Sequence, residues 1–147
     1  MYKLSQRSWN NLKTCHEDLQ KIAALAIKLT PVDFIITEGH RSKERQRQLF
    51  NEGLSKIDGY SRLGKHNYDP SMALDFCAYV PGKAKQLAFD QVHLASIGTA
   101  FHCAATLLYN EGEITHKLRW GANWDMDGEL LYDQRFRDMP HVELKKI

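Results

Sequence analysis

The chain has 147 residues, of which 43% are hydrophobic and 26% are charged, and its formal net charge is +2. This size suits one ordinary domain that buries a core without added cross-links. The charge fits contact with an anionic polymer, but it is too small to indicate a protein that binds nucleic acid.

Three scattered cysteines, Cys15, Cys77 and Cys103, argue against a disulfide framework, because any pairing scheme leaves one thiol over. We expect them to be reduced and mostly buried in a protein made in a cytoplasm. The N-terminus lacks the apolar segment of a secretory signal, and no apolar run looks long enough to cross a membrane. We therefore expect no stable insertion into a membrane.

Residues 5–29 are expected to be helical, in two pieces. The segment 14–17 fits a capping box, in which Thr14 is the N-cap and Glu17 reaches back to it. The apolar residues that follow have mostly helical spacing and predict a helix that packs on a core: Leu19, Ile22, Ala23, Ala26, Ile27 and Leu29. Pro31 ends this helix.

A strand is predicted over 32–37, because this segment is rich in β-branched and aromatic residues. Ser42 can cap a charged helix over 43–52 that ends at Gly53. Arg41 lies between the two elements, at a strand end, where loops often carry functional side chains. The alternative is an ordinary exposed arginine.

Residues 54–70 form a long polar connection, and such a loop inside a small domain is usually functional or disordered. A strand is predicted over 72–80, and it carries Asp75 among apolar neighbours. Burying a carboxylate there is costly unless it is paired or bound to a metal. Asp75 is therefore the most informative single residue of the chain.

The pattern over 83–110 is helical again, and Gly98 within it marks a kink, a break or a close packing site. His93 and His102 on this segment are interpreted as ordinary polar residues, since no metalloprotease helix motif contains them. Short strands are predicted over 117–120 and 139–144.

The segment 121–128 resembles the opening of a calcium loop, because Asn123, Asp125, Asp127 and Gly128 have the right spacing. The match fails at the twelfth position, where Gln134 replaces the bidentate glutamate. Turn chemistry alone accounts for these residue types. Ca²⁺ is therefore the less favoured interpretation.

Two imidazoles and one carboxylate, from His66, Asp75 and His141, form a possible ligand set for Zn²⁺. Zinc used for hydrolysis typically takes three protein ligands and leaves a fourth position open. Asp138 lies three residues before His141 and is placed to act as a general base. Arg41 would stabilise a developing oxyanion or bind a substrate carboxylate.

Each of these residues also has a purely structural explanation. A lone histidine in a strand is more often a hydrogen-bonded structural residue than a metal ligand, and Asp138 could be a turn residue before Pro140. The combination is more informative than its members, because hydrolysis needs ligands, a base and a cationic group together.

This combination resembles the zinc D,D-carboxypeptidase and L-alanyl-D-glutamate endopeptidase family, which shares its fold with the hedgehog signalling domain. The phage endolysin branch is the most similar in its motifs. These are Leu4-Ser5-Gln6-Arg7-Ser8, Leu29-Thr30-Pro31-Val32-Asp33-Phe34, Thr37-Glu38-Gly39, Arg45-Gln46-Arg47, Arg119-Trp120-Gly121 and Trp124-Asp125-Met126-Asp127-Gly128. The similarity therefore extends over about residues 5–144.

The resemblance implies zinc ligands at His66, Asp75 and His141, a general base at Asp138 and a substrate-contacting arginine at Arg41. The family motif Ser-x-His-x-x-Gly-x-Ala-x-Asp is altered here. Gly64 and Ser71 replace its serine and its glycine, and the first two ligands are nine apart instead of seven. Two extra loop residues can bulge outward at little cost, although the loop's substrate-facing side is then expected to differ.

We expect one α+β domain over 1–147, with a small antiparallel sheet, helices on one side and zinc at the open face. The resemblance implies a peptidase that cuts the stem peptide of peptidoglycan, at the L-alanyl-D-glutamate bond. As an endolysin, it would be made in the host cytoplasm and act on the wall as a monomer after release. The alternatives are a D-alanyl-D-alanine carboxypeptidase and a non-catalytic, metal-stabilised wall-binding module.

Overall fold

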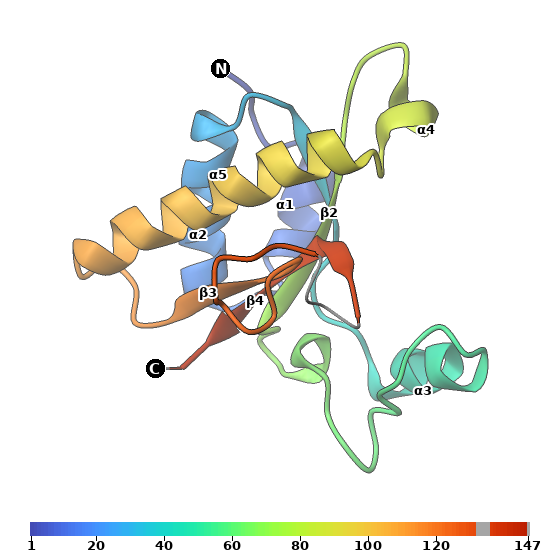
Figure 1. Ribbon diagram of the computed structural model, residues 1–147. Helices are drawn as coiled ribbons and strands as arrows, with labels where there is room; N and C mark the ends of the chain where they lie inside the picture. The colour runs from blue at the N-terminus through green and yellow to red at the C-terminus, as the bar shows by residue number, and fades with distance from the viewer. Residues whose placement is uncertain (132–135, 147) are drawn as a thin grey trace.

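Four antiparallel strands form a sheet in the order β1-β2-β4-β3. The strands are β1 (Phe34–Glu38), β2 (Ala73–Ala78), β3 (Lys117–Gly121) and β4 (Asp138–Lys145). The structure is a computed structural model that describes residues 1–131 and 136–146. In Figure 1, β3 and β4 lie below the long helix, and β4 lies in the interior of the sheet, between β2 and β3.

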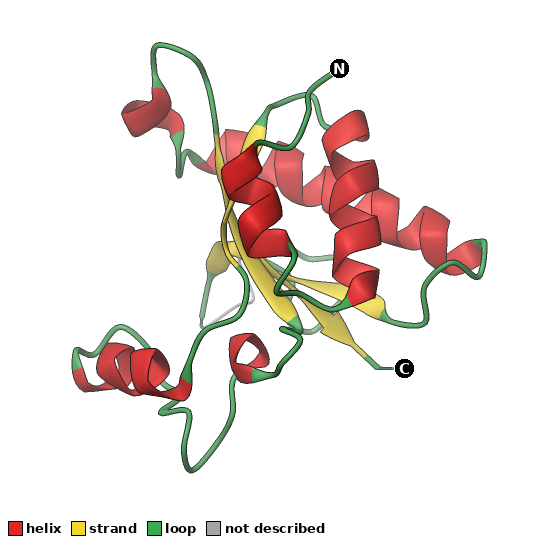
Figure 2. Ribbon diagram, turned by 180° about the vertical axis from the view of Figure 1, so that it is seen from behind, coloured by secondary structure: helices red, strands yellow, loops and turns green. Residues whose placement is uncertain are grey.

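Three helices cover one face of this sheet. They are α1 (Gln6–Leu12), α2 (Glu17–Leu29) and α5 (Gln91–Asn110), and the contacts of α1 with β1 and of α5 with β2, β3 and β4 hold them there. Figure 2 shows α1 and α2 from behind, packed beside the strands. The expected α+β fold, with helices on one side of a small antiparallel sheet, is confirmed.

The remaining helical pieces lie apart from this layer. The helix α3 (Lys43–Asn51) and the short 3-10 turn η1 (Lys65–Asn67) flank the open side of the sheet (Figures 1 and 2). The single turn α4 (Ala84–Leu87) precedes α5. Ser42 caps α3 by accepting a hydrogen bond from the backbone N–H of Arg45, as the sequence predicted.

Side chains of β2 and β4 alternate between the two faces, as the period of a strand requires. Leu74 and Phe76 of β2 and Val142 of β4 are fully buried in the core under the helices. Asp75 and His141 therefore point to the opposite, open face, and the register of the two strands places them directly beside each other. The pairing of β2 with β4 therefore places two of the predicted ligands side by side.

The helix α5 has the length and apolar composition of a membrane span, contrary to the expectation that no such run exists. Its core-facing side chains, among them Leu94, Ile97 and Phe101, are buried against the sheet and α2, whereas Val92 and Leu107 are exposed. Gly98 is a close packing site, because a Cβ there would lie 2.6 Å from the Trp120 ring.

Two local predictions were wrong. The N-cap of α2 is His16, whose Nδ1 accepts from the backbone N–H of Asp18, whereas the hydroxyl of Thr14 donates to the carbonyl of Asn11. The predicted helix over 83–110 is broken between α4 and α5, where the side chain of Asp90 caps α5. In both cases the helix begins later than predicted, at a residue whose side chain accepts from the backbone of the first turn.

The three cysteines are free thiols, as expected, but they are not equally buried. Cys15 lies in the core, where burial raises the pKa of its thiol to about 12, and Cys77 is partly buried. Cys103 is exposed on α5, so the expectation of mostly buried cysteines does not hold for it.

Candidate metal centre and active site

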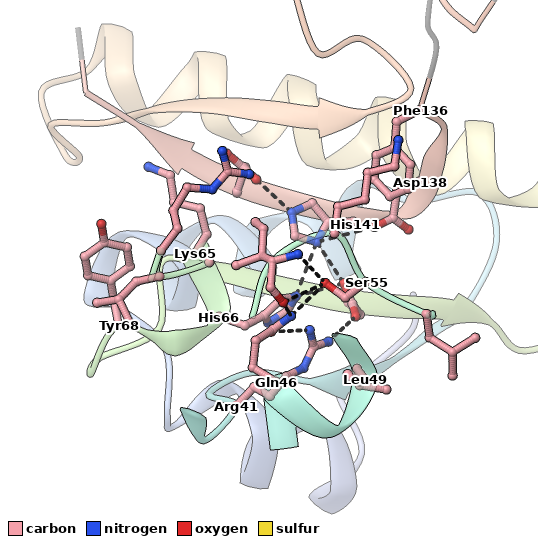
Figure 3. Close-up of a pocket in the computed structure, with 18 of the residues that line it drawn as sticks. Arg41, Gln46, Leu49, Ser55, Lys65, His66, Tyr68, Phe136, Asp138 and His141 are labelled. Atoms are coloured by element: carbon pink, nitrogen blue, oxygen red, sulfur yellow. Dashed lines mark hydrogen bonds and ion pairs between the residues drawn. The ribbon is translucent and has the colours of Figure 1, made fainter. Parts of the chain in front are cut away.

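His66, Asp75 and His141, which we call the cavity triad, converge at the open face of the sheet. Oδ1 of Asp75 lies 3.1 Å from Nε2 of His66 and 3.0 Å from Nδ1 of His141. The two ring nitrogens are 3.3 Å apart. Asp75 and His141 come from adjacent strands, and His66 comes from η1 (Figure 3).

The outer nitrogens of the two rings determine what the inner nitrogens can do. Nδ1 of His66 lies 2.7 Å from the carbonyl oxygen of Gly39, which can only accept, so this nitrogen carries the hydrogen in the neutral ring. Nε2 of His141 lies 2.9 Å from Oε1 of Glu143, which likewise accepts. Both neutral rings therefore direct a lone pair toward Oδ1 of Asp75.

Three acceptors that face one point require a cation there. Burial opposes positive charge on His141, but its hydrogen bonds with Asp75 and Glu143 raise its pKa to about 10. Burial likewise opposes charge on Asp75, and its hydrogen bonds with His141 and His66 nonetheless hold its pKa far below the usual range. A divalent cation would satisfy the same three atoms.

The donor set fits zinc in particular. Imidazole nitrogens and a carboxylate oxygen are common zinc ligands, and three protein ligands with an open position are typical of hydrolytic sites. The outer nitrogens of both rings are held by acceptors, which is the usual second layer of a zinc site. The same residues form one of two groups of His and Asp in the described chain that could hold a metal ion.

Asp138, the predicted base, lies beside the cavity triad. Its Oδ2 is 3.9 Å from Nδ1 of His141. Burial raises the pKa of Asp138, and the charge of His141 opposes this only in part. Gly121 on β3 makes this position possible, because a Cβ there would overlap the backbone carbonyl of Asp138.

Arg41 also lies where the sequence placed it, but much of its guanidinium is engaged. Nε and Nη2 donate to Glu38, Nη1 donates to Gln46 at 2.9 Å, and Nη2 lies 3.6 Å from Oδ2 of Asp75. Its backbone N–H donates to the carbonyl of His66, which couples it to η1. The arginine therefore supports Asp75 as well as lining the cavity.

Glu143 and Arg119 are members of the site that the sequence argument missed. Nη2 of Arg119 lies 2.7 Å from Oε2 of Glu143, whose other oxygen faces His141. Burial opposes charge on Glu143, yet the hydrogen bonds from His141 and Arg119 lower its pKa. The pattern His-x-Glu on a strand was a usable signal, since residues two apart share one face.

The site lies in a cavity of about 740 Å³. One wall comes from the 54–65 connection and α3, and the other carries Arg119, Trp124 and Phe136. In Figure 3, Phe136 and Asp138 lie above His141, and Leu49 lies below it. The described parts of the 54–65 connection and of the segment between β3 and β4 thus border one cavity.

Of the departures from the family motif, Gly64 lines the cavity, whereas Ser71 and the two-residue insertion lie away from it. Ser71 is fully buried, and it pairs with the segment before α2 through its backbone bonds to Thr14 and His16. Asp69 and Pro70, at the two-residue insertion, are exposed. Neither they nor Ser71 line the cavity, but Gly64 and Tyr68 of the same loop do, so the expected change on the substrate-facing side of this loop stays a prediction.

The calcium interpretation stays a prediction. Oδ1 of Asn123 and Oδ1 of Asp125 both accept from the backbone N–H of Asp127, as in ordinary Asx turns. Gln134, the residue at the twelfth position, lies outside the described residues.

A second cluster with the same residue types lies on the helical side of the sheet. His16, Asp18 and His116, which we call the anchor triad, could hold a metal ion by spacing alone. Oδ2 of Asp18 accepts from the ring Nδ1 of His116 at 2.8 Å and from the backbone N–H of Thr115 at 3.0 Å. Local sequence patterns do not reveal this cluster, because Asp18 and His116 are 98 positions apart.

Comparison with known proteins places the chain among peptidases. The family model described as phage L-alanyl-D-glutamate peptidase matches residues 1–145. The L-alanyl-D-glutamate peptidase of Escherichia phage T5 is 32% identical over 146 residues, which cover 97% of this chain and 98% of that protein.

Two bacterial proteins are similar as well. The peptidoglycan L-alanyl-D-glutamate endopeptidase CwlK of Bacillus subtilis strain 168 is 28% identical over 116 residues, which cover 77% of this chain and 61% of that protein. The crystal structure of the L-Ala D-Glu endopeptidase ChiX of Serratia marcescens superposes with a TM-score of 0.76 at 26% identity. That match covers 98% of this chain and 90% of the ChiX chain.

Proposed function

Because the chain belongs to the phage L-alanyl-D-glutamate peptidase family, we propose that it hydrolyses the L-alanyl-D-glutamate bond of peptidoglycan stem peptides as a zinc enzyme. The observation that carries the metal assignment is the convergence of three lone-pair donors, from His66, Asp75 and His141, beside the carboxylate of Asp138. Residues 1–147 form the single catalytic domain of this proposal.

The cavity triad, Asp138 and Arg41 have different roles in the proposed reaction. The cavity triad would hold Zn²⁺, which supplies Lewis acidity to the scissile carbonyl and to the attacking water. Oδ2 of Asp138 accepts a proton from that water and then donates it to the leaving nitrogen of D-glutamate. Arg41 holds positive charge beside the triad, where negative charge develops on the carbonyl oxygen.

The cavity supports an endopeptidase. A substrate that extends on both sides of the cut bond needs walls on two sides of the catalytic groups, and the 54–65 connection and the Trp124–Phe136 side supply them. One chain contributes the triad, the base and both walls, so we propose that it acts as a monomer. We further propose the role of a phage or prophage endolysin, made in the host cytoplasm and acting on the wall after release, which the phage family model and the phage T5 relative support.

Digestion of purified peptidoglycan tests this function. We expect new N-terminal D-glutamate on the released stem peptides, identified by mass spectrometry, and loss of this product after treatment with a chelator. Release of free D-alanine from a muramyl pentapeptide, without new N-terminal D-glutamate, would instead establish a carboxypeptidase.

A further inference from the structure

His141 is the one member of the cavity triad whose outer nitrogen contacts a charged side chain. Nε2 of His141 lies 2.9 Å from Oε1 of Glu143, and Oε2 of Glu143 lies 2.7 Å from Nη2 of Arg119. Glu143 is buried, with 4% of its surface exposed. The register places Arg119 directly beside Glu143 on the neighbouring strand.

This arrangement gives each oxygen of Glu143 one donor. We propose that Glu143 is a positioning residue for the metal centre: it selects the tautomer of His141 that keeps the hydrogen on Nε2 and leaves the lone pair of Nδ1 for the metal. Arg119 determines which oxygen of Glu143 accepts from His141, because its guanidinium occupies the other oxygen. This inference rests on the proposed function, since it concerns the same metal.

The tautomer of His141 decides whether this residue can bind the metal through Nδ1. A neutral ring has one N–H and one lone pair, so a hydrogen on Nδ1 removes the metal-binding position of His141. A buried carboxylate only accepts, and it therefore favours the hydrogen on Nε2. Gly39 has the corresponding role for His66, but through a neutral backbone carbonyl that no side-chain substitution removes.

The substitution Glu143→Gln gives a sharp test, because an amide has only one accepting oxygen. With Arg119 present, the amide oxygen and its NH₂ group must divide between Arg119 and His141. If the guanidinium takes the oxygen, the NH₂ group faces Nε2 of His141 and favours the wrong tautomer. We expect the Zn²⁺ affinity to fall about 10- to 100-fold, the range known for outer partners of metal ligands.

The double variant Glu143→Gln with Arg119→Met separates tautomer selection from simple charge balance. Without the guanidinium, the amide oxygen is free to turn toward His141, so the double variant should bind Zn²⁺ more tightly than Glu143→Gln alone. The single variant Arg119→Met should change the affinity by only a few-fold, because Glu143 still accepts from His141. An exposed control with the same chemical change, Glu113→Gln, should leave the affinity unchanged.

The measurement is the dissociation constant of Zn²⁺, from competition with a chromophoric chelator, for variants whose circular dichroism matches that of the wild type. The Co²⁺ absorption spectrum provides a second readout of the ligand geometry at His141. Recovery in the double variant supports the proposal. Equal affinity in wild type and Glu143→Gln, or a double variant no tighter than Glu143→Gln, overturns it while zinc binding by the wild type stands. A wild-type chain that binds no zinc overturns both this inference and the proposed metal.

Discussion

The cavity triad and the anchor triad contain the same side chains, two histidines and one aspartate, but they use their lone pairs in opposite ways. In the cavity triad, both imidazoles give their outer nitrogens to acceptors, so their inner lone pairs meet the carboxylate of Asp75. In the anchor triad, the lone pair on Nδ1 of His16 already accepts the backbone N–H of Asp18. Composition and spacing alone therefore do not identify a metal site.

The partners of the two carboxylates explain the difference. Asp18 lies in the first turn of α2 and receives backbone N–H groups of Thr115 and His116 in addition to the ring of His116. Its hydrogen bonds connect α2 to the segment that leads into β3. We interpret the anchor triad as a structural connection, because its hydrogen-bond donors and acceptors match. We interpret the cavity triad as a metal site, because its hydrogen-bond acceptors outnumber its donors.

The largest expected effect is that of His141→Ala compared with His116→Ala. Removing one of three metal ligands should abolish zinc binding and peptidase activity together, a larger loss than the roughly 10- to 100-fold typical of outer partners. The variant His116→Ala should keep zinc binding and peptidase activity, although it lowers the free energy of unfolding. Elemental analysis and peptidoglycan digestion of the two variants make the measurement. Full zinc occupancy in His141→Ala would remove that residue from the ligand set.

The second largest expected effect is that of replacing the general base, Asp138. Asp138→Asn should keep zinc and fold, but lower kcat by about 10²- to 10⁴-fold, since an amide cannot accept the proton of water. The anchor-side counterpart, Asp18→Asn, should leave kcat within a few-fold, because no residue of the anchor triad lines the cavity. Steady-state rates on a defined stem peptide compare them. A rate for Asp138→Asn close to that of the wild type would refute the assignment.

Gly121→Ala tests the position of the base without changing its chemistry. A Cβ at this residue overlaps the backbone carbonyl of Asp138, so the start of β4 must shift. A displacement of about 1 Å can lower a rate on the order of a hundred-fold. We expect zinc content to stay near that of the wild type while kcat falls. Unchanged kcat would show that the strand adjusts without moving the carboxylate.

The pH dependence of kcat provides a finer measure of Asp138. Burial raises the pKa of its carboxyl above the usual value of about 3.9, and the charged form is the base. The rate should therefore fall as the pH drops through this raised value. At saturating zinc, the residual rate of Asp138→Asn should lack this acid limb. An acid limb of the same position in both enzymes would assign it to another group.

The sequence predicted those parts of the site that local patterns encode. Asp75 was found because a carboxylate interrupts an apolar strand, and Asp138 because it lies three residues before His141. Arg119 and Glu143 required the pairing of β3 with β4, which periodicity does not specify. The anchor triad required the packing of α2 against the segment before β3.

The N-cap of α2 also could not be predicted from local sequence patterns alone. Both Thr14 and His16 can accept a hydrogen bond from a helix N-terminus, and the pattern favoured the threonine. In the structure the hydroxyl of Thr14 instead accepts from the backbone N–H of His40 and donates to the end of α1. The hydroxyl of Thr14 is therefore engaged in a tertiary contact, which local sequence patterns do not reveal.

The smallest expected effect is on stability. Asp18→Asn should lower the free energy of unfolding by about 1 to 3 kcal/mol at neutral pH, because a buried carboxylate loses hydrogen bonds and the ring of His116 loses its acceptor. Chemical denaturation of the zinc-free protein measures the difference. The matched control is Asp69→Asn, which makes the same change at an exposed loop residue and should alter stability by no more than about 0.5 kcal/mol.

The pH dependence of this difference tests its electrostatic origin. Burial opposes charge on Asp18, but the hydrogen bonds from His116 and Thr115 lower its pKa in the folded protein. A lowered pKa of an acid stabilises the fold above the unfolded-state value of about 3.9, and this contribution disappears as the pH falls through the folded-state value. The stability gap between wild type and Asp18→Asn should therefore be constant near neutrality and narrow in acid. A gap that does not change with pH would mean that packing, and not the charge of Asp18, holds the anchor triad together.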